Sequence, residues 1–245
     1  MIEINDPRGS RWNRWDPHIH TPETILNDQY AGTDPWDEFL RRVESSNPPI
    51  RALGITDYFS VETYVKTLQF KAAGRLPSVG LIFPNIEMRY GIGTGRGAPI
   101  NVHLLVCPVD SDHVEQIRRF LRSLTFDAFG ESYRCESSDL MRLGKAHDPT
   151  VTSDKQALAA GVTQFKINPD LLRAEWKRST WIQENVLIAV AAGSGDGTSG
   201  LQTADSSLAT PRGTPENRPM GDTSKPANGI RQDKVVITHN GPWRQ

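Results

Sequence analysis

The run Asp16-Pro17-His18-Ile19-His20-Thr21 contains the residues whose types and spacing most clearly suggest chemistry. On an extended strand, alternate side chains point to the same face, so His18 and His20 are expected to project together, with Asp16 on the same side. Two imidazoles one strand step apart can bind a single metal ion, and Asp16 would then orient a histidine from behind. The alternative is a pair of surface histidines near the end of a strand.

Three further polar residues interrupt or end apolar segments. Asp57 ends the run 50–57, Glu87 lies within the apolar run 82–88, and His103 is flanked by aliphatic residues. Ligands collect at the carboxyl ends of strands in α/β barrels, and a carboxylate in an apolar strand needs a partner or a cation. The alternatives are that Asp57 only caps the next helix, that Arg89 neutralises Glu87, and that His103 is a satisfied core histidine.

Alternating apolar and amphipathic segments must position these residues. Apolar or extended segments predict strands at 14–20, 50–55, 79–88, 99–108 and 186–192. Helical spacing predicts helices that begin near residues 35, 60, 112 and 137 and a helix over 169–184, and Asp34 is the expected N-cap of the first. Pro17 favours an edge position, or the end of its strand, for the first of these segments. Strands that alternate with helices predict an α/β domain, with parallel pairing expected.

Composition limits the function classes. The 245 residues include 28 Lys+Arg and 29 Asp+Glu, a formal net charge of -1, which argues against a non-specific grip on nucleic acid but not against a local basic groove. No apolar run approaches the roughly 18–20 residues of a membrane span, and the first residues do not resemble a signal peptide. We therefore expect a cytoplasmic protein without membrane contact, in which Cys107 and Cys135 are free thiols.

The composition changes from residue 193 onward. Gly, Ser, Thr, Asp and Pro dominate 193–229, and the large apolar residues there are Leu201, Leu208 and Met220. Such a segment buries too little apolar surface to offset a backbone entropy cost of about 1–2 kcal/mol per residue. We expect a folded domain over 1–202 and a disordered low-complexity tail over 203–245, in which the apolar run 235–237 is a candidate edge strand.

Taken in order, these four groups of residues resemble three motifs of the PHP (polymerase and histidinol phosphatase) family. The runs 16–22 and 54–57 match its first two motifs, although Tyr58 stands where the family usually has histidine, and Glu87 and His103 fit the third. The residues of these motifs are more similar still to those of the PHP-like N-terminal domain of TrlF-type AAA-like ATPases. Phe83-Pro84-Asn85-Ile86-Glu87-Met88-Arg89 and Asn101-Val102-His103-Leu104-Leu105 carry that likeness, which covers about residues 9–202.

The resemblance implies a distorted or incomplete βα barrel that holds one or two divalent ions of Mn, Zn or Fe. The metal ligands that it implies are His18, His20, Asp57, Glu87, His103 and Asp196. It also implies supporting or substrate-binding positions for Asp16, Tyr58 and Arg89. The sequence departs from the family at Asp196-Gly197-Thr198, which lacks the histidine of the final D-x-H motif.

Two functions follow from the resemblance. One is a metal-dependent phosphoesterase that hydrolyses a phosphomonoester or a nucleic-acid phosphodiester with metal-activated water. The other is a non-catalytic PHP-like regulatory or interaction module, separated from an ATPase partner. The retained ligand types favour the enzyme, whereas Tyr58 and Thr198 in place of histidines favour the module. The sequence contains no Gly-x-x-x-x-Gly-Lys-Ser/Thr motif, so we expect no nucleotide-hydrolysing P-loop of its own.

Overall fold

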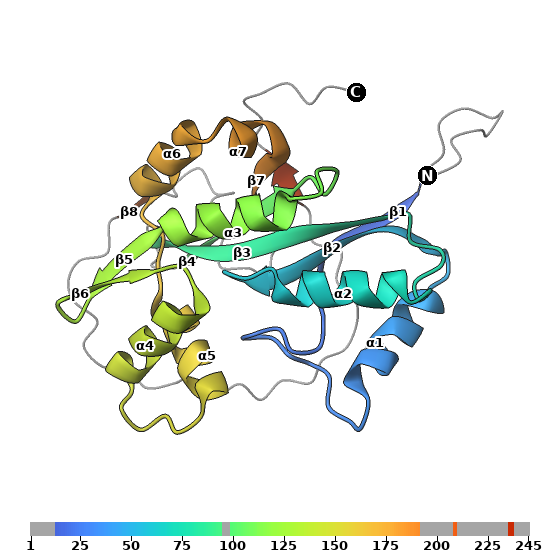
Figure 1. Cartoon of the computed structure of the whole chain (residues 1–245), viewed down its shortest axis with the longest axis horizontal. Coiled ribbons are helices and arrows are strands. Elements are labelled where there is room, and N and C mark those ends of the chain that lie inside the picture. The colour runs from blue at the N-terminus through green and yellow to red at the C-terminus, as the bar shows by residue number, and fades with distance from the viewer. Residues whose placement is uncertain (1–12, 95–98, 192–207, 210–234, 238–245) are drawn as a thin grey trace.

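A mixed β-sheet forms the centre of the molecule (Figure 1). The computed structural model describes residues 13–94, 99–191, 208–209 and 235–237. The main strands follow the order β1-β2-β3-β4-β7, with bounds β1 Arg14–His20, β2 Ile50–Tyr58, β3 Leu81–Thr94, β4 Pro99–Val106 and β7 Val186–Ala191. β1, β2 and β3 are parallel, whereas β4 runs antiparallel to both β3 and β7.

The α/β class is confirmed, but the described residues form an open sheet and not a closed barrel. Parallel pairing is confirmed only for the first three strands. The reason is the short connection between Thr94 and Pro99, because strands joined by so few residues pair as an antiparallel hairpin, whereas a parallel pair needs a crossover of a dozen or more residues.

Two short strands within the predicted tail join this sheet. β8 (Leu208–Ala209) pairs with β3, and β9 (Val235–Ile237) pairs with β7. The candidate edge strand at 235–237 is therefore confirmed. The remainder of the tail predicted over 203–245 lies outside the described residues.

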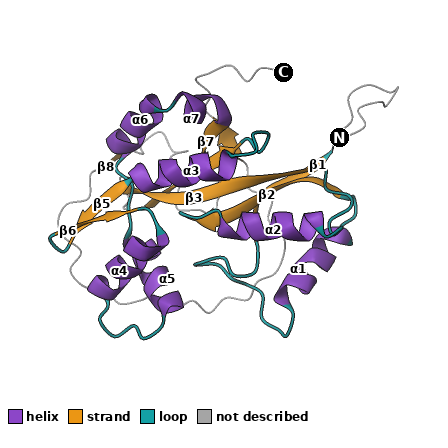
Figure 2. Cartoon of the chain, viewed as in Figure 1, coloured by secondary structure: helices purple, strands orange, loops and turns teal. Residues whose placement is uncertain are grey.

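Seven helices accompany the described part of the sheet (Figure 2). Their bounds are α1 Pro35–Glu44, α2 Glu62–Ala72, α3 His113–Ser123, α4 Ser137–His147, α5 Asp154–Gln164, α6 Pro169–Arg178 and α7 Thr180–Asn185. Asp34 caps α1 as predicted, since its side chain accepts from the Asp37 N–H. The helix predicted over 169–184 breaks at Ser179, whose side chain caps α7. None of the described helices combines the length and apolarity needed to cross a bilayer.

Two features were not predicted from the sequence: helix α5 and the small hairpin of β5 (Thr125–Ala128) and β6 (Glu131–Arg134). α5 has almost no amphipathic pattern, because it packs through small residues. A Cβ on Gly161 would lie 1.7 Å from the Leu140 carbonyl of α4, so the two backbones are in direct contact. Helical periodicity does not signal a contact of that kind.

The two faces of the sheet differ in polarity. Strand register places Ile55, Ile86 and Leu104 on one face, where they are buried against helices that include α2 and α3 (Figure 2). The residues that alternate with them point to the other face, and these include Glu87 and His103, which are directly paired across β3 and β4. The candidate site therefore lies on the polar face of the sheet.

Candidate metal centre

A bulge in β1 brings His18 over the sheet. Asp16 pairs with Leu53 and Ile19 pairs with Ile55, so β1 takes three steps where β2 takes two. An extra residue of this kind bends a strand and re-aims its side chains. The regular alternation expected for Asp16, His18 and His20 is therefore broken.

Gly54 makes room for the bulge. A Cβ at this position would lie 2.1 Å from the Pro17 carbonyl oxygen and 2.8 Å from the Phe83 ring, so only glycine fits beneath the bulged backbone. The Asn85 Nδ2 group reaches across from β3 and donates to that same Pro17 carbonyl at 2.9 Å. Gly54 and Asn85 together fix the backbone that carries His18.

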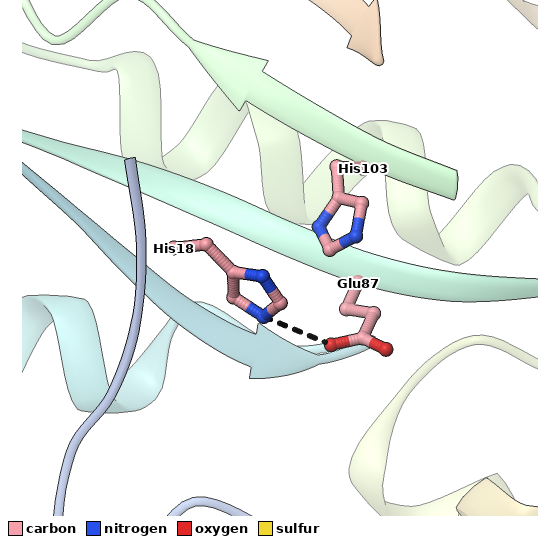
Figure 3. Close-up of side chains that lie close together, drawn as sticks. All are labelled: His18, Glu87 and His103. Carbon is pink, nitrogen blue, oxygen red and sulfur yellow. Dashed lines mark ion pairs between the residues drawn. The ribbon is translucent and has the colours of Figure 1, made fainter. Parts of the chain in front are cut away.

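His18, Glu87 and His103 form a compact group on β1, β3 and β4 (Figure 3). Each residue offers one ligand atom, and the three atoms lie within 4.8 Å of one another. His18 Nε2 is 3.5 Å from Glu87 Oε2, and the rings of His18 and His103 have centroids 4.8 Å apart. Two imidazoles and one carboxylate that converge in this way could hold a metal ion.

Two asparagines determine which atoms of this group face inward. His103 Nδ1 lies 3.0 Å from Asn85 Oδ1, and Asn101 Nδ2 donates to Glu87 Oε1 at 3.1 Å. His103 Nε2 and Glu87 Oε2 are buried, and neither has a hydrogen-bond partner in the described part of the chain. Polar atoms left in this way are costly to bury, and a cation would satisfy both. The donor set suits Zn, Fe or Mn.

The protonation states also suit a cation. Burial lowers the pKa of His103 to about 4, although the Glu87 charge opposes the shift, so the imidazole is neutral near pH 7. Burial would raise the pKa of Glu87, but the interaction of its carboxylate with His18 and the charges of the three histidines outweigh burial and lower the pKa. Neutral imidazole and ionised carboxylate are the forms that bind metals.

His20 and Tyr58 flank the group. His20 Nε2 lies 3.2 Å from His18 Nε2 and 3.8 Å from Glu87 Oε2, and burial lowers the His20 pKa to about 4. The Tyr58 ring stacks on His20 with centroids 5.5 Å apart. Burial, followed by the nearby Glu87 charge, raises the pKa of Tyr58, so its hydroxyl stays protonated.

Asp57 is not brought into the group. It pairs with Ile86 across β2 and β3, which puts it on the face opposite Glu87. Its carboxylate accepts from the Ile25 and Tyr58 backbone N–H groups and from the Thr63 hydroxyl. It does not cap α2, whose N-cap residue Val61 makes no side-chain hydrogen bond. Asp57 therefore ties the loop after β1 to the start of α2.

The other predicted site residues have different surroundings. Asp16 accepts from the His18 backbone N–H at 3.3 Å and not from an imidazole, and burial raises the pKa of Asp16. Arg89 forms no ion pair with Glu87, and its Nε is buried without a hydrogen-bond partner among the described residues. Asp196 and Thr198 lie outside the described residues.

No role was predicted from the sequence for Asn85, Asn101 or Lys166. Asn85 and Asn101 each precede a proposed ligand by two residues, and this spacing puts both on the ligand's face of the strand. That period-two pattern of polar residues in apolar strands was a usable signal. Nothing in the sequence places Lys166, which follows α5, beside the distant strand β3.

Comparison of the sequence with models of known protein families finds no match, and comparison with curated protein sequences finds no match either.

Proposed function

We propose that this protein is a metal-dependent phosphoesterase of the PHP type, in which the open sheet corresponds to part of the family's distorted barrel. The observation that carries the proposal is the group of His18, Glu87 and His103, in which Glu87 Oε2 and His103 Nε2 are buried and have no hydrogen-bond partner among the described residues, although Glu87 Oε2 lies within ion-pair distance of His18 and His20. A purely structural histidine would use its second nitrogen in a hydrogen bond, and a purely structural glutamate would accept a hydrogen bond at its second oxygen.

In this proposal His18, Glu87 and His103 hold the cation, and His20 either completes that site or holds a second ion. Asn85 keeps the proton of His103 on Nδ1, so Nε2 presents its lone pair to the site. Asn101 fixes the Glu87 carboxylate through Oε1. When bound, a divalent cation supplies Lewis-acid polarisation of a phosphoryl oxygen and activates water. Arg89, on the same face, is placed to meet the substrate's phosphate.

The experiment is hydrolysis of bis(p-nitrophenyl) phosphate and of p-nitrophenyl phosphate with added Mn²⁺. We expect the wild type to hydrolyse at least one of them, and Glu87→Gln to lose activity by about a hundredfold or more, since it removes the charge of a ligand. Glu131→Gln is the matched control, because Glu131 is exposed on β6 and pairs with Arg142. Equal activity in wild type and Glu87→Gln would end the proposal.

The second candidate is a metal-binding module without catalysis, and one observation favours it. Asp57 faces away from the group and Tyr58 stands beside it, so two positions that the resemblance assigns to ligands supply none among the residues described. This module would act through a partner, which the resemblance suggests is an ATPase. Bound metal without hydrolysis of either ester would favour the module.

A further inference from the structure

Lys166 lies in the segment after α5, which pairs with the end of β3. The Ile167 N–H donates to the Arg89 carbonyl at 2.8 Å, and the Gly91 N–H donates to the Ile167 carbonyl at 2.8 Å. These bonds form a parallel bridge between Tyr90 and Ile167. The residues that precede this pair share the other face of the two segments, so Arg89 and Lys166 lie side by side.

The amine of Lys166 is half-buried and has no carboxylate partner among the described residues. Its Nζ donates to the carbonyls of Thr163 and Phe165 at the end of α5. Burial, and then the Arg89 charge, lower the pKa of Lys166 to about 8. An exposed lysine has a pKa of about 10.4, so near neutral pH a much larger share of this amine is unprotonated, which is its nucleophilic form.

Arg89 lacks an anionic partner. It forms no ion pair with any residue that the structure describes, and its Nε is buried without a hydrogen-bond partner there. A guanidinium is best satisfied by a carboxylate, whose two oxygens accept its N–H groups. An anionic group on Lys166 would therefore stabilise Arg89, whereas the ammonium form of Lys166 repels it.

A cavity of about 360 Å³ gives small molecules access to Lys166, which forms part of its wall. The rest of the described wall comes from the end of β3, from β5 and from the start of α6. Asp127 is the other charged residue among those described in the wall, and it is exposed and forms no ion pair with Lys166. A small uncharged reagent can therefore approach the amine without electrostatic repulsion.

We propose that Lys166 reacts with carbon dioxide to form a carbamate, and that the carbamate pairs with Arg89. The lone pair of the neutral amine forms a bond to carbon, an electron pair of one C=O bond moves to oxygen, and one N–H proton passes to water. The charge of the side chain changes from positive to negative, so repulsion between the two neighbours becomes attraction.

Carbon dioxide fits this site better than other electrophiles do. It is small and uncharged, and its product carries a carboxylate-like group that can accept from the buried Arg89 Nε. An acyl group would leave a neutral amide and no counter-charge for Arg89. The inference does not depend on the proposed phosphoesterase function.

The test is carbon-13 NMR of the full chain in labelled bicarbonate, combined with ethylation of carbamates by triethyloxonium and peptide mass mapping. We expect the wild type to form a carbamate at Lys166, with a yield that rises as the pH rises through about 8 at constant dissolved carbon dioxide. The N-terminal amine, whose ordinary pKa is about 7.7–8.0, also reacts and serves as an internal reference in every variant.

Lys166→Arg keeps the positive charge but has no reactive amine, so its signal should be lost while the N-terminal signal remains. Arg89→Gln keeps the amine but removes its partner, so the yield at Lys166 should fall by at least about tenfold. Lys145→Arg is the matched control, because Lys145 is exposed and pairs with Asp154. It should leave the yield at Lys166 unchanged.

The proposal is overturned if mapping finds no carbamate at Lys166 of the wild type, or if folded Arg89→Gln keeps the full yield there. A signal that persists in Lys166→Arg would belong to another amine and would also overturn it. The readout involves neither a metal nor an ester. Loss of the phosphoesterase proposal therefore leaves this result intact, and the reverse also holds.

Discussion

Asp57 and Glu87 differ by one step in strand register, and this step determines which face of the sheet each carboxylate points to. Both are buried carboxylates on neighbouring strands, with Asp57 2 % exposed and Glu87 4 % exposed. Glu87 lies opposite Tyr58 and Asp57 opposite Ile86, so the two acids face opposite sides of the sheet. Glu87 keeps an oxygen with no hydrogen-bond partner among the described residues, whereas both Asp57 oxygens accept hydrogen bonds, one from the Ile25 N–H and one from the Thr63 hydroxyl of α2. Only Glu87 is placed to bind a cation.

The first prediction follows from that difference. Asp57→Asn should bind Mn²⁺ within about threefold of the wild-type affinity, because an amide oxygen can still accept from Ile25 and Tyr58. Isothermal titration calorimetry measures both affinities. A loss of binding comparable to that of Glu87→Gln would show that Asp57 is a ligand after all.

The second prediction concerns the pH dependence of stability. Burial raises the pKa of Asp57 to about 6, so the folded state holds this proton more tightly than the unfolded state. The stabilisation of the folded state by this proton on Asp57 is complete below the unfolded pKa near 3.8 and is lost as the pH rises through 6. The free energy of unfolding of Asp57→Asn, relative to that of the wild type, should therefore rise by on the order of 2–3 kcal/mol between pH 4 and pH 7. Urea unfolding across this range measures the difference, and a constant difference would contradict the account.

Among the elements, β1 does most to build the site. Its bulge carries His18 toward β4, and Gly54 of β2 is the residue that permits the close approach. Neither feature follows from the pattern of β1 alone, because a bulge depends on what lies beneath it.

The third prediction tests this arrangement. Gly54→Ala should destabilise the fold by about 1–3 kcal/mol, a typical cost of overpacking. It should also weaken Mn²⁺ binding by at least about tenfold, since the backbone that carries His18 must move. Gly91→Ala is the matched control, because its Cβ would make ordinary contacts of 3.6 Å or more. Unchanged Mn²⁺ affinity in Gly54→Ala would show that the bulge does not position the site.

Much of the element order could be predicted from sequence, because long amphipathic or apolar runs carry their own period. Two shorter signals, the cap at Asp34 and the apolar run 235–237, were also confirmed. The antiparallel pairing of β3 with β4 agrees with the sequence, because the glycine-rich segment 91–97 leads straight into the next strand and is too short for a parallel crossover. Helix α5 was not predicted because its contact with α4 uses backbone and small residues. The position of Lys166 was not predicted because its neighbour Arg89 is 77 positions away in the sequence.

At the scale of the molecule, helices such as α2 and α3 cover the apolar face of the sheet, and the candidate centre lies on the other face. The three residues of the group come from three strands, β1, β3 and β4. A cation held by all three would link these strands, so its binding energy would add to the stability of the whole sheet.

The fourth prediction uses this coupling. Mn²⁺ at about 100 times its Kd should raise the free energy of unfolding by about 2.7 kcal/mol, seen as a higher Tm. Glu87→Gln should show no such rise, while Glu131→Gln should respond as wild type does. Equal shifts in all three proteins would place the ion elsewhere on the chain.

The most direct measurement of the central claim is the metal content of the purified chain after loading with Mn²⁺ or Zn²⁺ and gel filtration. We predict about one tightly bound ion per chain in the wild type, with His20 as the residue beside which a second ion would bind. His18→Ala, Glu87→Gln and His103→Ala should each reduce the bound metal by more than about tenfold while remaining folded by circular dichroism. A folded His103→Ala or Glu87→Gln protein that retains its full metal content would contradict the account.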